Sequence, residues 1–182
     1  MAMQYVRIKI GGEERDFPVV SMGPKLKIAS VTLLGDVKLV DEAAKILAGR
    51  IGKWEPEVLV GPETKVVPLL QRMSELLGLE RYVVCRKGIQ AYMISPLVVE
   101  LVEARARRVR EMAVDGRDAQ YLQGKRVVVV DDVVFTGGSW QAVRKLLDKA
   151  GAKYQGLAAV FKQGELFKEP YIYIQELPTF AG

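Results

Sequence analysis

The feature that most constrains this chain is a run of four valines, residues 127–130, that leads directly into two adjacent carboxylates. An uninterrupted β-branched run is typical of a strand that is buried on both faces in the middle of a parallel sheet. Asp131 and Asp132 follow where we expect the buried part of the strand to end. Residues 140–150 then have the apolar spacing of a helix, which ends at Gly151. The predicted order is strand, acidic pair, glycine-rich turn and helix.

The turn before this helix, Thr-Gly-Gly-Ser at residues 136–139, has the character of an anion site. The first N–H groups of a helix have no partner within the helix and favour an anion, above all a phosphate. Carboxylates beside such a site accept hydrogen bonds from sugar hydroxyls or bind a divalent metal. Phosphate, polyol and metal together indicate a sugar phosphate as the ligand. The alternative is that the acidic pair only ends a strand and the two glycines only form a turn. Isolated Asp-Asp or Gly-Gly pairs usually have such a structural role, whereas the whole string of residues 127–139 is more specific.

The whole string from residue 127 to residue 139 resembles the phosphoribosyl-pyrophosphate signature of the type I phosphoribosyltransferases. The resemblance implies that Asp131 and Asp132 accept hydrogen bonds from the ribose 2′- and 3′-hydroxyls and contact Mg²⁺ through substrate or water. It also implies that Val134 and Phe135 lie against the base. The residues that the resemblance places around the 5′-phosphate are Phe135, Thr136, Gly137, Gly138 and Ser139.

A second strand end, residues 61–65, resembles the pyrophosphate loop of adenine phosphoribosyltransferases, whose pattern is Gly-Pro-Glu-Ala/Ser-Arg-Gly. Lys65 replaces the arginine of that pattern and Val66 replaces its last glycine, so the positive charge remains while bidentate geometry is lost. Arg86 and Lys87 follow a third predicted strand, where two adjacent cations are suited to hold a leaving pyrophosphate. The residues expected to bind the pyrophosphate part are Glu63, Thr64, Lys65, Arg86 and Lys87.

Composition narrows the chemistry available to the chain. Its 182 residues predict one domain with a core of its own. The absence of histidine excludes Ser-His-Asp and Cys-His arrangements and every histidine-ligated metal site. The one cysteine, Cys85, lies in an apolar run, so we expect a buried thiol and not a nucleophile. No signal peptide or apolar stretch of membrane-spanning length is visible, which together with the cysteine count favours a cytoplasmic protein without membrane contact.

The net charge of +5 and the isoelectric point near 9.3 indicate an anionic partner. A nucleic acid is the alternative to a phosphorylated small molecule. The densest basic stretch, residues 105–110, is flanked by Glu100, Glu103 and Glu111. It lacks the interleaved aromatic residues on which single-stranded bases would stack, so nucleic acid is the less favoured partner.

Strands and helices alternate through the middle of the chain, which predicts an α/β fold with a doubly wound, mainly parallel sheet. Ligands of such sheets bind at the carboxyl ends of the strands, where all the motifs above fall. The expected strands are 4–10, 14–20, 27–34, 58–60, 81–85, 127–130 and 154–161, and the expected helices are 38–51, 66–77 and 140–150. Asp36 is suited to cap the first helix.

The ends of the chain do not follow this alternation. By resemblance to purine phosphoribosyltransferases, residues 1–35 and about 164–182 form a hood over the base, and residues 36–163 form the core. The same resemblance makes residues 88–112, which we expect to be irregular, a flexible loop that closes over the reaction centre and keeps water out. The relatives also imply a homodimer.

The implied reaction is Mg²⁺-dependent displacement of pyrophosphate from the anomeric carbon of phosphoribosyl pyrophosphate by a nucleobase, with Lys87, Asp131 and Asp132 as the catalytic residues. Phe135 stands where hypoxanthine-guanine enzymes carry an aspartate, which favours adenine as the base. Lys162 stands where 6-oxopurine enzymes use a lysine, which favours such a purine as the alternative. A third possibility is a non-catalytic regulatory protein that binds phosphoribosyl pyrophosphate as a signal.

Overall fold

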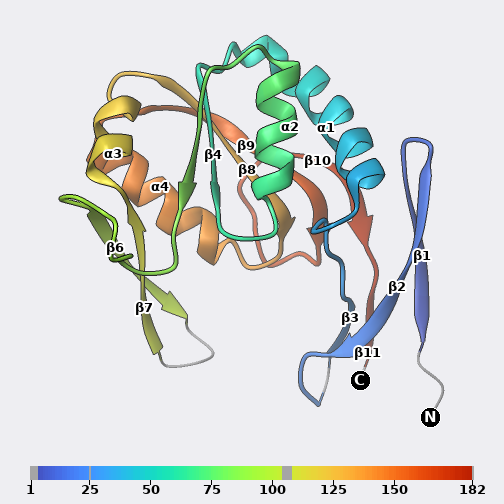
Figure 1. Ribbon diagram of the computed structural model, residues 1–182. Helices are drawn as coiled ribbons and strands as arrows, with labels where there is room; N and C mark the ends of the chain where they lie inside the picture. The colour runs from blue at the N-terminus through green and yellow to red at the C-terminus, as the bar shows by residue number, and fades with distance from the viewer. Residues whose placement is uncertain (1–3, 25, 104–107, 182) are drawn as a thin grey trace.

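The computed structural model describes residues 4–24, 26–103 and 108–181 of the chain. A central five-stranded sheet has helices on both faces, and a smaller antiparallel sheet projects from one end of it (Figure 1). The strands of the central sheet are β4 (Val58–Pro62), β5 (Tyr82–Cys85), β8 (Arg126–Val134), β9 (Lys153–Gln163) and β10 (Ile172–Leu177). They lie in the order β10-β9-β8-β4-β5, and each neighbouring pair is parallel. The prediction of a doubly wound parallel sheet is confirmed, and the valine strand β8 is its middle strand.

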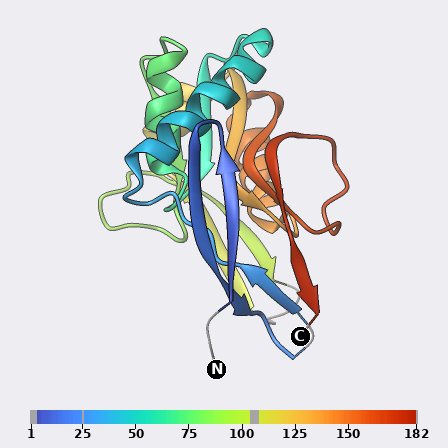
Figure 2. The ribbon, with the colours of Figure 1, turned by 90° about the vertical axis from the view of Figure 1, so that its right-hand side faces the viewer.

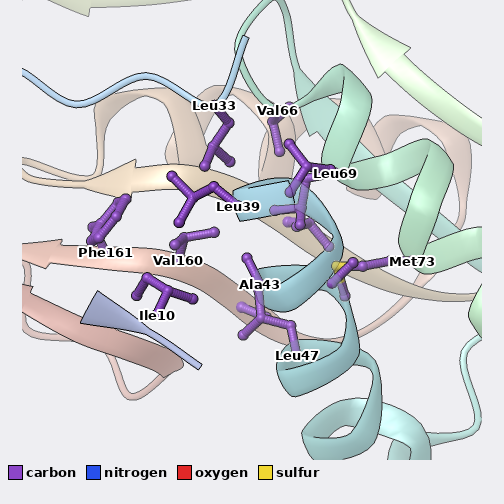
Figure 3. Packing of buried hydrophobic residues seen from close by; sticks show 14 of the residues in the cluster. Ile10, Leu33, Leu39, Ala43, Leu47, Val66, Leu69, Met73, Val160 and Phe161 are labelled. Carbon is purple, nitrogen blue, oxygen red and sulfur yellow. The ribbon is translucent and has the colours of Figure 1, made fainter. Parts of the chain in front are cut away.

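Two pairs of helices cover the two faces of this sheet. The helices are α1 (Val37–Ile51), α2 (Val67–Leu76), α3 (Gly116–Leu122) and α4 (Gly138–Ala150), with a short 3₁₀ turn, η1 (Gly52–Trp54), after α1. Val128 and Val130 pack in one buried cluster with α1 and α2, while Val127 and Val129 pack in a second cluster with α3 and α4. Figure 3 shows the first cluster, in which α1 and α2 meet β9. Because successive side chains of a strand point to opposite faces, the valine run fills both clusters, as predicted.

The smaller sheet, called the hood from here on, joins the two ends of the chain. Its strands are β1 (Tyr5–Ile10), β2 (Glu13–Ser21), β3 (Leu26–Ala29) and β11 (Thr179–Ala181), in the order β1-β2-β3-β11. Figure 2 shows the C-terminal strand beside the N-terminal strands, and β11 is antiparallel to β3. The expectation that all of 164–182 belongs to the hood is wrong in one part, because β10 extends the central sheet instead.

The segment predicted as an irregular loop contains regular structure. Strands β6 (Leu97–Glu103) and β7 (Arg108–Val114) form a two-stranded antiparallel sheet. Val99, Met112 and Val114 are buried in the second cluster beside α4, and this apolar face holds the hairpin against the core. Residues 104–107 of the predicted loop, like 1–3, 25 and 182 of the predicted hood, lie outside the described residues.

Other local predictions concern single residues. Asp36 caps α1, since its Oδ1 accepts a hydrogen bond from the Leu39 N–H at 3.1 Å, as predicted. Cys85 is buried, as predicted, and this burial raises the pKa of its thiol to about 12. In the described part of the chain, no helix is both long and apolar enough to cross a bilayer.

Candidate active site

A cavity of about 670 Å³ lies between the carboxyl ends of β4 and β8 and the hood. The loop after β4 contributes Glu63, Thr64 and Lys65 to its wall, and the segment after β5 contributes Lys87. From β8 and the turn after it come Asp131, Asp132, Phe135 and Ser139. The hood covers these polar groups with Val20 and Met22 of the β2 region and Ile28 and Ala29 of β3. Residues far apart in the sequence thus meet in one site, at the sheet edge where the fold predicts a ligand.

The acidic pair lies within β8 and not beyond its end. Asp131 is 8% exposed, and its Oδ1 accepts a hydrogen bond from the Asp132 N–H at 2.8 Å. Burial, and next the neighbouring Asp132 carboxylate, raise the pKa of Asp131 well above its usual range, while the Lys87 ammonium opposes this rise. A buried carboxylate of this kind is stabilised by a ligand that donates hydrogen bonds or brings positive charge.

The carboxylates of the cavity also decide what kind of metal site the protein could form. Among the described residues, no three Asp, Glu or Cys side chains gather closely enough to form a metal site of their own. Mg²⁺ in proteins is commonly held by one or two carboxylates together with water and substrate phosphates. Asp131 and Asp132 fit that role, with the phosphate oxygens of a substrate completing the coordination.

A smaller cavity of about 110 Å³ lies against the turn at the start of α4. Its wall includes the turn from Phe135 to Ser139, so Phe135 and Ser139 border both cavities. Thr136, Gly137 and Gly138 line only the smaller one. Val134 is buried and also lines only the smaller cavity, so its position does not support the predicted contact with a base. The start of a 13-residue helix directs its free N–H groups to this cavity, as a phosphate site requires.

Gly137 is required by this turn for two separate reasons. Its φ of +77° belongs to the left-handed region, which side chains other than glycine rarely adopt. A Cβ atom at this position would also lie 2.2 Å from the ring of Phe167. Phe167 itself packs edge-to-face on Trp140 of α4, with ring centroids 5.1 Å apart.

The two cations after β5 have different positions. Arg86 Nε lies 2.8 Å from Glu63 Oε2 as an ion pair without hydrogen-bond alignment, and Arg86 does not line the larger cavity. The other carboxylate oxygen, Glu63 Oε1, accepts a hydrogen bond from the Lys87 N–H at 2.5 Å. Lys65 Nζ donates to the Val31 carbonyl at 3.0 Å, at the base of the hood. Lys65 and Lys87 therefore bring positive charge to the cavity, and Arg86 orients Glu63.

The structure does not bring Lys162 to this site. Its ammonium pairs with Glu165, lies 3.7 Å from Glu176 Oε2, and does not line the cavity. Hydrogen bonding to Glu165 raises the pKa of Lys162, so its charge is engaged by these carboxylates. The predicted role of Lys162 in binding the base is therefore not supported.

The next residue of β9, Gln163, lines the cavity and was not predicted from the sequence. Side chains alternate along a strand, so Gln163 shares the face of Phe161 and lies on the face opposite Lys162. The signal that could have found it is a polar side chain at the end of the apolar run 157–161, on the face opposite Lys162.

Comparisons with known proteins agree with this geometry. A family model described as the phosphoribosyl transferase domain matches residues 32–181. An adenine phosphoribosyltransferase of Petrotoga mobilis is 28% identical over 128 residues, which cover 70% of each chain. A hypoxanthine/guanine phosphoribosyltransferase of Methanocaldococcus sp. is 29% identical over 133 residues, covering 72% of this chain and 63% of that protein.

Solved structures show the same fold. The adenine phosphoribosyltransferase of Thermoanaerobacter pseudethanolicus superposes with a TM-score of 0.68 at 22% identity, covering 82% of this chain and 88% of that chain. The purine phosphoribosyltransferase of Pyrococcus horikoshii superposes with a TM-score of 0.56 at 25% identity, covering 75% of this chain and 82% of that chain.

Proposed function

We infer, since this chain belongs to the phosphoribosyl transferase domain family, that it transfers a 5-phosphoribosyl group from phosphoribosyl pyrophosphate to a purine, with adenine as the first choice. The products are the nucleoside monophosphate and pyrophosphate, as in purine salvage in the cytoplasm. The observation that carries this proposal is that one cavity joins the buried acidic pair, the two ends of the phosphate turn (Phe135 and Ser139) and two lysines at neighbouring strand ends. As in the implied relatives, we propose a homodimer.

Each group has a role in this reaction. Asp131 and Asp132 accept hydrogen bonds from the ribose hydroxyls and fix the sugar ring. The turn at residues 135–139 holds the 5′-phosphate with its N–H groups and hydroxyls. Lys65 and Lys87 balance the charge of the departing pyrophosphate. Mg²⁺ held at Asp131 and Asp132, directly or through substrate or water, would supply further positive charge there.

The bond changes follow from this placement. The C1′–O bond breaks with its electron pair on pyrophosphate, and a ring nitrogen of the base bonds to C1′. The proton of that nitrogen passes to a carboxylate or to solvent, because the chain has no histidine. Catalysis by this site is mainly positioning and charge compensation.

The choice of base follows from the cavity wall. Phe135 lines the cavity and can neither take nor give a proton, which favours adenine. Lys162, the residue that favoured a 6-oxopurine, is held away by Glu165 and Glu176. A 6-oxopurine remains the second candidate, because the Methanocaldococcus relative is named for hypoxanthine and guanine. A non-catalytic regulator is the third.

The test is pyrophosphate release from phosphoribosyl pyrophosphate and Mg²⁺, with adenine, hypoxanthine, guanine, xanthine, orotate and uracil supplied one at a time. We expect turnover with adenine, no release without a base, and no turnover when EDTA removes the metal. Binding of phosphoribosyl pyrophosphate without turnover on any base would overturn the enzymatic proposal and favour the regulator. Light scattering of the same preparation tests the dimer.

A further inference from the structure

Gln163 is the one cavity residue whose buried polar group lacks a partner in the described part of the chain. The residue is 2% exposed, and its Nε2 donates to no protein acceptor within hydrogen-bonding distance. An unpaired buried amide normally carries a cost in stability. Such a cost is tolerated where a ligand completes the hydrogen bonds, and Gln163 lies in the wall of the cavity that receives the ligand.

The register of the sheet fixes the height of Gln163 above the acidic pair. Asp131 is level with Ala159 of β9, and Val134 is level with Lys162. Gln163 therefore stands four residues beyond the level of Asp131, roughly 13 Å at the usual rise of a parallel strand. That separation matches a ribose joined to a purine with a hydrogen bond at either end.

The walls around Gln163 are suited to the flat faces of a base. Ile28 and Ala29 of the hood and Phe135 of the phosphate turn are apolar and line the same cavity. These side chains can contact the ring system but cannot distinguish its substituents. The amide of Gln163 therefore supplies polar contacts at this end of the cavity.

We propose that Gln163 binds the 6-substituent edge of the purine and allows the site to accept both 6-aminopurines and 6-oxopurines. This inference rests on the proposed function. A glutamine amide carries a donor and an acceptor side by side and can turn over. In one orientation it pairs with the amino group and a ring nitrogen of adenine, as glutamine does in nucleic-acid recognition. In the other it donates to the 6-oxygen of hypoxanthine and accepts from N1–H, so both kinds of purine are accepted.

The experiment measures binding by calorimetry of AMP, IMP and ribose 5-phosphate to the full chain, with Mg²⁺ present. For the unaltered protein we expect the Kd values of AMP and IMP to lie within about tenfold of each other. Gln163→Met removes the amide while keeping the length of the side chain. We expect this variant to raise the Kd values of AMP and IMP by about tenfold each and to change the Kd of ribose 5-phosphate by less than about twofold. Its Tm should not fall, because an unpaired polar group has been removed.

Two further variants sharpen the result. Gln163→Glu, measured near pH 8, offers only acceptors when ionised, so it should lose one of the two hydrogen bonds to each purine and raise the Kd values of AMP and IMP alike. Gln155→Met changes an exposed glutamine on the same strand and should leave all three Kd values unchanged. The inference is overturned if Gln163→Met binds AMP and IMP with the Kd values of the unaltered protein. It is overturned likewise if the variant loses as much affinity for ribose 5-phosphate as for AMP and IMP. It is also overturned if the unaltered protein separates AMP from IMP by far more than tenfold.

Failure of the proposed function gives a different pattern. In that case no base supports pyrophosphate release by the unaltered protein. The effect of Gln163→Met on AMP relative to ribose 5-phosphate is still measured, because nucleotide binding does not need turnover.

Discussion

Asp131 combines a cost to folding with a role in ligand binding. Its carboxylate is buried next to that of Asp132, so its ionised form is disfavoured in the folded protein. Asp131→Asn should therefore raise the Tm of the free protein by about 2–4 °C, the shift that 1 kcal/mol gives in a chain of this length. The same change should abolish turnover. Calorimetric Tm values without ligand, with the less buried Asp132→Asn as the control, check this, and a lower Tm for Asp131→Asn would contradict it.

The raised pKa of Asp131 also predicts opposite effects of pH on folding and on binding. The folded protein holds the Asp131 proton at a pH where the unfolded chain has lost it, so this residue's contribution to stability improves as the pH falls through the raised pKa. The ionised carboxylate accepts hydrogen bonds from ribose hydroxyls more strongly than the protonated form does, so the Kd of ribose 5-phosphate should increase over the same window. That window lies above the ordinary aspartate value of about 3.9. Titration of binding from about pH 8 to pH 5 tests this, and Asp131→Asn should remove that part of the dependence.

Among the elements, those with a strong local signal were predicted from the sequence. The valines of β8 specified a strand buried on both faces, and Asp36 marked the start of α1. The strand β10 gave no comparable signal, because it follows β9 through a loop without an intervening helix. The hairpin of β6 and β7 is held by contacts with α4 that are distant in sequence. Lys162 was predicted at the site, but the structure places its neighbour Gln163 in the cavity wall. The two side chains point to opposite faces of β9, because a shift of one residue along a strand reverses the face.

The phosphate turn is the element in which backbone and packing constraints coincide. Gly137→Ala should lower stability and the affinity for ribose 5-phosphate, because the turn must move to relieve both the positive φ and the contact with Phe167. Gly151→Ala is a matched control at the other end of α4. Its φ is +70°, but the nearest atom to an added Cβ is 3.7 Å away, on Gln123. We expect Gly151→Ala to cost about 1 kcal/mol and to leave binding intact. Equal losses of affinity in the two variants would show that Phe167 is irrelevant to the turn.

At the scale of the whole molecule, the hood and the core must be aligned for the cavity to exist. Apolar packing, such as that of Phe17 on Phe161, and hydrogen bonds connect them. The Gly12 N–H, between β1 and β2, donates to Glu42 of α1 at 3.1 Å. Arg15 of β2 donates to both carboxylate oxygens of Asp36, the cap of α1, at 2.6 Å and 3.0 Å. Lys65 of the pyrophosphate loop donates to Val31, just after β3. The hood is thus attached to α1 and to the pyrophosphate loop, and its position depends on them.

This attachment predicts a selective kinetic effect. Arg15→Met removes the bidentate pair while keeping the Asp36 cap, so the hood should be less well positioned over the base. We expect the KM for the purine to rise severalfold and the KM for phosphoribosyl pyrophosphate to stay unchanged, because the acidic pair and the phosphate turn belong to the core. Arg7→Met is the matched control, since it removes an exposed ion pair with Asp16 that lies entirely within the hood. Such an exposed pair contributes little, so neither KM should change. If Arg15→Met raised the two KM values equally, the hood would act on the whole site and not on the base alone.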